Sequence, residues 1–174
     1  ETVPSLEEAL AFTRRNRWSI NVEIKDMKGM GGDHFVEEIV RDIRQQGMEG
    51  SVLVSSFSAD VLARVHELCP TLPTAWLVRQ VPRDVEKVLE IIGADGVHVH
   101  HEHVNAAEVQ GLRDRGFAFR VYTVNRRADM MRFAGLGVDG IITDFPHVLR
   151  KVLTELPKVR FERSRHCIDD RAGC

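Results

Sequence analysis

Hydrophobic and polar residues alternate along the chain in two periods, one typical of strands and one typical of helices. The period of two predicts six strands, over residues 19–25, 51–57, 74–78, 96–100, 117–125 and 138–144. The helical period predicts seven helices, over residues 5–15, 34–46, 58–69, 82–92, 105–115, 127–136 and 147–156. Glycine or proline follows most of these helices, as expected for residues that end a helix.

A regular alternation of strands and helices predicts an α/β protein with a parallel sheet and helical crossovers. A doubly wound sheet and a (β/α)8 TIM barrel are the two architectures that fit. No Gly-x-Gly-x-x-Gly follows any predicted strand, which argues against the first. A barrel needs eight strands and about 250 residues. We therefore expect six of its eight strand–helix units in residues 1–156 as one domain, followed by a charged, poorly ordered tail over 157–174.

The first predicted strand carries the candidate chemistry. Its alternation places Ile20, Val22 and Ile24 on one face, and Glu23 and Lys25 on the other. In an α/β barrel the carboxyl ends of the strands carry the active site. Glu23 is a candidate ligand for a hard cation, and Lys25 is a candidate phosphate contact. The alternative is an ordinary ion pair at a strand end.

Composition narrows the class of protein. The 174 residues are 43% hydrophobic and 29% charged, as in a soluble globular protein, and the net charge of -2 predicts neither a nucleic-acid nor a membrane partner. No apolar run approaches the roughly 20 residues of a membrane span. Cys69, Cys167 and Cys174 are too few for a disulfide framework, which favours a cytoplasmic protein with reduced thiols.

Four histidines cluster at the end of the fourth predicted strand: His98, His100, His101 and His103. His98 and His100 share one strand face, where they either line the barrel or contact substrate. His101 and His103 are expected in a surface loop. A transition-metal site is the weaker alternative, because no helical His-x-x-x-His pair is present and no acid or cysteine is evident to complete a tetrahedral set.

Five stretches, in order, resemble the glycerophosphodiester phosphodiesterase family, in particular its compact bacterial cytoplasmic members. They are residues 3–9 (VPSLEEA), 21–25 (NVEIK), 54–57 (VSSF), 122–125 (YTVN) and 137–144 (GVDGIITD). The resemblance implies a TIM barrel in which residues 19–25 form the third strand. It also implies hydrolysis of a small glycerophosphodiester to glycerol 3-phosphate and an alcohol, in lipid and glycerol metabolism, with Ca²⁺ or Mg²⁺ as cofactor.

The resemblance also implies roles for individual residues. Glu23 becomes a metal ligand, and Lys25 becomes a catalytic and phosphate-binding residue. The other implied substrate contacts are Phe57, His98, His100, Tyr122 and Asn125. Tyr122 stands where the family often has tryptophan. Ser55 and Ser56 are expected to line the mouth of the site or cap a helix, and Asp144 to orient a neighbouring residue or cap the last helix.

The sequence departs from the family in one respect. The family's His-Arg-Gly motif and its further metal ligands would lie upstream of residue 1. We therefore expect an internal start within a longer enzyme, with little or no activity from these 174 residues alone. The alternative is a non-catalytic barrel remnant that binds phosphate or a partner, with self-association as a further alternative. A His-Arg-Gly about 50 to 70 residues upstream, at the end of a strand, would favour the enzyme.

Overall fold

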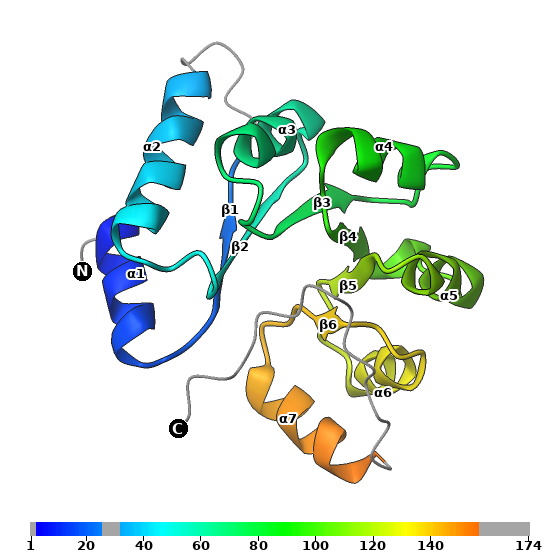
Figure 1. Cartoon of the computed structure of the whole chain (residues 1–174). Helices are drawn as coiled ribbons and strands as arrows, with labels where there is room; N and C mark the ends of the chain where they lie inside the picture. Colours follow the sequence, from blue (N-terminus) through cyan, green and yellow to red (C-terminus); the bar gives the residue numbers. More distant parts are fainter. Residues whose placement is uncertain (1–2, 26–31, 157–174) are drawn as a thin grey trace. The chain divides into compact units, whose positions relative to one another are not determined.

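The computed structural model describes residues 3–25 and 32–156, in which helices and strands alternate (Figure 1). The strands are β1 (Ile20–Glu23), β2 (Val52–Ser56), β3 (Thr74–Val78), β4 (Gly96–His100), β5 (Ala118–Tyr122) and β6 (Gly140–Ile141). The α-helices are α1 (Leu6–Arg15), α2 (Gly32–Gln45), α3 (Ala59–Leu68), α4 (Val85–Ile92), α5 (Ala106–Asp114), α6 (Arg127–Gly135) and α7 (Pro146–Glu155). A short 3₁₀ helix, η1 (His101–His103), follows β4.

The described residues fall into two compact units. Of the described residues, the first unit comprises 3–25, 32–76 and 89–94, and the second comprises 77–88 and 95–156. The chain therefore passes between the units within β3, within α4 and again after Ala94. Every strand pair described below is parallel. Parallel neighbours joined by helices are what the alternating sequence pattern predicts.

The first unit is built on β1 and β2, which pair in parallel with Glu23 opposite Ser55. Helix α1 begins with a capping box, in which Ser5 and Glu8 each bond the other's backbone N–H. Helix α2 contacts both α1 and α3. Their apolar faces enclose a core with no exposed surface at Leu10, Ile43, Val52 and Val54. The hydrophobic periods therefore identify the residues that hold this unit together.

The second unit contains β4, β5 and β6, paired in that order. Phe119, Val121, Met130 and Phe133 are fully buried within it. Gly96 lies opposite Ala118, and a Cβ on Gly96 would stand 2.1 Å from the Ala118 carbonyl oxygen. Position 96 therefore requires glycine, because the backbone of the paired strand leaves no room for a side chain.

The predicted elements are all present, although most strands are shorter than expected. The sequence predicts residues 138–144 as a strand, but β6 is only Gly140–Ile141 because Thr143 and Asp144 turn to bond Asn125. His101–His103 is a 3₁₀ turn where a loop was predicted. The glycine-rich segment 26–31 and the tail 157–174 lie outside the described residues.

Cys69 is a free, buried thiol. Among the described helices, none combines the length and apolarity needed to cross a membrane.

Candidate active site

Strand β1 separates an apolar face from a polar one. Ile20 and Val22 pack against the core of the first unit, while Asn21 and Glu23 are exposed on the opposite face. The strand period of two produces this division directly. The face that carries Glu23 is therefore the face that the helices of this unit leave open.

Glu23 and Lys25 form an ion pair at the carboxyl end of β1. Lys25 Nζ lies 2.5 Å from Glu23 Oε1, and the side chains are 32% and 73% exposed, respectively. The ammonium is thus free to exchange its carboxylate partner for another anion, while the carboxylate offers hard oxygen ligands to a cation.

The serines that end β2 are held by hydrogen bonds. Asn21 Nδ2 donates to Ser55 Oγ at 3.0 Å, and Ser56 Oγ donates to the Ile24 carbonyl at 2.7 Å. Ser56 Oγ also accepts from the Ser58 backbone N–H at 3.1 Å. Both serines are fully buried, and Ser58 is the N-cap of α3. Ser55 and Ser56 therefore fix the strand end.

Phe57 follows β2 and is 49% exposed. Its carbonyl accepts a hydrogen bond from Trp76 Nε1 at 3.3 Å, which anchors the backbone beneath an accessible ring. An exposed aromatic ring on a fixed backbone is suited to contact an apolar part of a ligand.

In the second unit, four polar side chains belong to one face of the β4–β5 pair. His98 lies opposite Arg120, and His100 lies opposite Tyr122. The His100 and Tyr122 rings meet edge to face with centroids 5.6 Å apart. Tyr122 also donates its hydroxyl hydrogen bond to the Val78 carbonyl at 3.1 Å. This contact fixes the ring of Tyr122 beside His100.

His98 is the most unusual titratable group of the described chain. It is 1% exposed, and neither ring nitrogen has a hydrogen-bond partner among the described residues. Burial lowers the pKa of His98 from 6.5 to about 3, and the positive charge of Arg120 acts in the same direction. His98 is therefore a neutral, buried imidazole at neutral pH.

This burial predicts a pH-dependent stability. Above pH 6.5 the imidazole is neutral in both the folded and unfolded chains, so its protonation does not reduce the free energy of unfolding there. As the pH falls from 6.5 towards 3, the unfolded chain binds a proton that the folded chain excludes. Because of this residue, the free energy of unfolding should then fall by up to about 1.4 kcal/mol per pH unit.

The measurement is urea unfolding between pH 7 and pH 4 in the presence of chelator. His98→Leu should flatten the pH dependence, whereas His147→Gln, which removes an exposed imidazole from α7, should leave it unchanged. Equal slopes for the wild type and His98→Leu would contradict the assignment.

Asn125 joins the end of β5 to the segment after β6. Its Nδ2 donates to Asp144 Oδ2 at 2.7 Å, while its Oδ1 accepts from the Asp144 backbone N–H at 3.0 Å and from Thr143 Oγ1 at 3.2 Å. Asp144 thus has the neighbour-orienting contact that the sequence suggested as one alternative. These three bonds fix the amide of Asn125.

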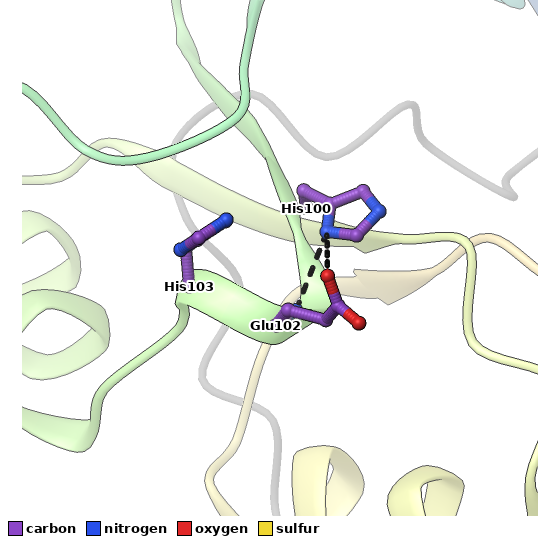
Figure 2. A group of neighbouring side chains, drawn as sticks. All are labelled: His100, Glu102 and His103. Carbon is purple, nitrogen blue, oxygen red and sulfur yellow. Dashed lines mark hydrogen bonds and ion pairs between the residues drawn. The ribbon is translucent and has the colours of Figure 1, made fainter.

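The structure corrects one expectation about the histidine cluster. The sequence indicated no acid that would join it, but one ligand atom from each of His100, Glu102 and His103 lies within 4.8 Å of the other two (Figure 2). Glu102 Oε2 is 3.7 Å from His100 Nδ1. The pKa of His100 is lowered, first by burial and then by the neighbouring His101.

Sequence reasoning also missed Arg120. The signal was available, because Arg120 and Tyr122 are two residues apart in a strand and share a face. Gly140 of β6 lies opposite Arg120 of β5, and the Arg120 side chain packs against it. A Cβ on Gly140 would stand 3.2 Å from Arg120 Cγ. Glycine at position 140 thus leaves room for this arginine.

The parallel β/α fold places the chain among the α/β proteins, in which site residues lie at the carboxyl ends of the strands. The profile of the glycerophosphoryl diester phosphodiesterase family matches residues 1–148. The chain belongs to this family.

Individual relatives agree with this assignment. The chain is 34% identical to a glycerophosphodiester phosphodiesterase of Bacillus altitudinis over 160 residues, covering 89% of the chain and 64% of the relative. It is 31% identical to one from Bacillus subtilis (strain 168), covering 86% of the chain and 54% of the relative. The chain therefore spans between about half and two thirds of the length of these curated relatives.

The fold also has structural neighbours. A phosphodiesterase from Oleispira antarctica, solved in complex with the product sn-glycerol-3-phosphate, superposes with a TM-score of 0.81 at 22% identity and covers 88% of this chain and 62% of its own. At this identity the likeness concerns the fold. This likeness confirms the prediction of a partial (β/α)8 barrel and not of a doubly wound sheet.

Proposed function

We propose that this chain is part of a divalent-cation-dependent phosphodiesterase that hydrolyses small glycerophosphodiesters to glycerol 3-phosphate and an alcohol. The observation that carries the proposal is the Glu23–Lys25 pair at the open end of β1. Membership of the phosphodiesterase family supports it, as does the product bound to the Oleispira antarctica neighbour.

Glu23 would hold the cation, with Ca²⁺ or Mg²⁺ proposed because a carboxylate is a hard oxygen ligand. When bound, this ion supplies positive charge that offsets the negative charge developing on the phosphoryl oxygens. Glu23 fits as one ligand of such an ion, because its carboxylate is 32% exposed and its described partner is an exposed ammonium.

The proposed role of Lys25 is to bind the phosphodiester anion. Its 73% exposed side chain can leave Glu23 and contact a phosphate oxygen, so that substrate binding separates the ion pair seen here. Phe57 is proposed to contact the alcohol group. In the second unit, His98, His100, Tyr122 and Asn125 are proposed substrate contacts, with His100 and Tyr122 already held together.

The test is release of glycerol 3-phosphate from glycerophosphocholine. In the longer enzyme of which this chain is proposed to be part, we expect turnover with Ca²⁺ or Mg²⁺ present. With EDTA we expect the rate to fall by about 10²–10³-fold, the effect of losing one major electrostatic contribution. EDTA saturated with Ca²⁺ before addition is the control, and it should not inhibit. An unchanged rate in EDTA would exclude the cation from the reaction.

A second candidate function is phosphate or partner binding without catalysis. It needs only the exposed Lys25 ammonium, which can bind an anion without any catalytic group. Calorimetric binding of glycerol 3-phosphate without any turnover of glycerophosphocholine would favour this alternative.

A further inference from the structure

The end of β4 gathers ligands that the proposed reaction does not use as a set. His100 is the last residue of the strand, and Glu102 and His103 belong to η1, which follows at once. Figure 2 shows the Glu102 carboxylate beside the ring of His100, with the ring of His103 on the other side of the same turn. One ligand atom of each residue lies within 4.8 Å of the other two.

The short helix explains why these three residues meet. A 3₁₀ helix has three residues per turn, so residues three apart lie one above the other. His100 is its N-cap and His103 is three residues later. Their ring centroids are 6.0 Å apart, and the Glu102 backbone N–H makes only a long contact of 3.5 Å to His100 Nδ1.

The surroundings orient the His100 ring. Tyr122 meets it edge to face, and His101 stacks on it at 4.7 Å with a tilt of 30°. Such packing reduces the rotamer freedom that would otherwise be lost when a ligand binds. Glu102 and His103 are exposed, so a cation from solvent can reach them.

The donor atoms indicate the kind of cation. Two imidazole nitrogens and one carboxylate oxygen form the set that Zn²⁺ and neighbouring transition metals prefer, whereas Ca²⁺ and Mg²⁺ prefer oxygen ligands alone. We propose that His100, Glu102 and His103 form a Zn²⁺-type site at the end of β4, separate from the hard-cation site proposed at Glu23. Three protein ligands leave a fourth tetrahedral position for water or an anion.

The site is compatible with a substrate contact from His100. Nδ1 is the nitrogen that faces Glu102 (Figure 2). A metal bound there replaces the long contact with the Glu102 N–H and leaves Nε2 for another partner. The proposal does not depend on phosphodiesterase activity, and binding alone tests it.

The experiment is calorimetric titration of the metal-free 174-residue chain with Zn²⁺, with and without excess Mg²⁺. We expect one Zn²⁺ per chain that Mg²⁺ does not displace. His103→Ala and Glu102→Gln should each weaken binding at least as much as loss of an outer-shell partner, which costs about 10–100-fold. Titration with Co²⁺ should give visible absorption bands that decrease in the same variants.

Two further variants test whether Zn²⁺ binds at these three residues or elsewhere on the chain. His147→Ala removes an exposed imidazole from α7 and should leave Zn²⁺ affinity unchanged. Glu23→Gln should also leave it unchanged, even if the proposed function fails. Absence of stoichiometric Zn²⁺ binding, or binding that survives His103→Ala but is lost in Glu23→Gln, would overturn the proposal. Because Glu102 and His103 are exposed, their variants should keep the wild-type melting temperature, which confirms that folding is intact.

Discussion

Glu23→Gln is expected to lower the rate of glycerophosphodiester hydrolysis by about 10²–10³-fold. The substitution keeps the shape of the side chain and removes its charge, so the proposed cation loses a carboxylate ligand. It should also abolish any rise in melting temperature that Ca²⁺ or Mg²⁺ gives the wild type, because a cation stabilises only the state that binds it. The measurements are glycerol 3-phosphate release and thermal unfolding with and without the ion.

Glu38→Gln is the matched control for this variant. Glu38 is a partly exposed glutamate within α2 that forms ion pairs with His34 and Arg41. It should retain both activity and the response to the cation. Loss of the Glu23–Lys25 pair costs little stability on its own, since exposed ion pairs contribute about 0–1 kcal/mol. A Glu23→Gln protein with full activity would remove Glu23 from the metal site.

Gly96→Ala is expected to destabilise the second unit by about 1–3 kcal/mol, the usual cost of overpacking. Its Cβ would stand 2.1 Å from the Ala118 carbonyl oxygen and 2.7 Å from the carbonyl carbon. These are backbone atoms of the paired strand and cannot rotate away, so β5 itself has to move. Thermal unfolding should show a decrease of about 2–4 °C for each kcal/mol lost.

Gly111→Ala makes the same chemical change in open space. Gly111 lies within α5, and an added Cβ there would have no neighbour within 4 Å. Alanine should therefore raise stability by about 0.5–1 kcal/mol, since it favours the helix and restricts the unfolded chain. If both variants were destabilised equally, the close approach at Gly96 would not be the reason.

The fold was predicted from the sequence to a large extent because its signals are local. Alternation over residues 19–25 placed Ile20 and Val22 towards the core and Glu23 on the open face, as the structure shows. The ends of strands were less well predicted. The strand pattern that was predicted to reach Asp144 stops sooner. Ile142 still bonds Val121 and Val124 through its backbone, whereas Thr143 and Asp144 bond the side chain of Asn125.

The candidate site was only partly predictable. Glu23, Lys25 and the histidines of β4 were chosen from the sequence because they lie in predicted strands near the ends where barrel chemistry lies, and their roles stay predictions. Glu102 was missed because the three residues after the strand were expected to be a loop. Arg120 was missed although the period of two places it on the same strand face as Tyr122. Its position opposite His98 depends on the register between β4 and β5, which the sequence does not give.

The sequence by itself determined the period of each element, the face on which each strand residue lies, and the apolar residues that form the cores. Tertiary structure alone decided which polar groups from distant elements meet: Asn21 with Ser55, His98 with Arg120, and Asn125 with Asp144. The 3₁₀ turn likewise decided that Glu102 faces His100. The physical reason is that periodicity acts between neighbours in sequence, whereas strand register and turn geometry are fixed by packing between segments far apart in the chain.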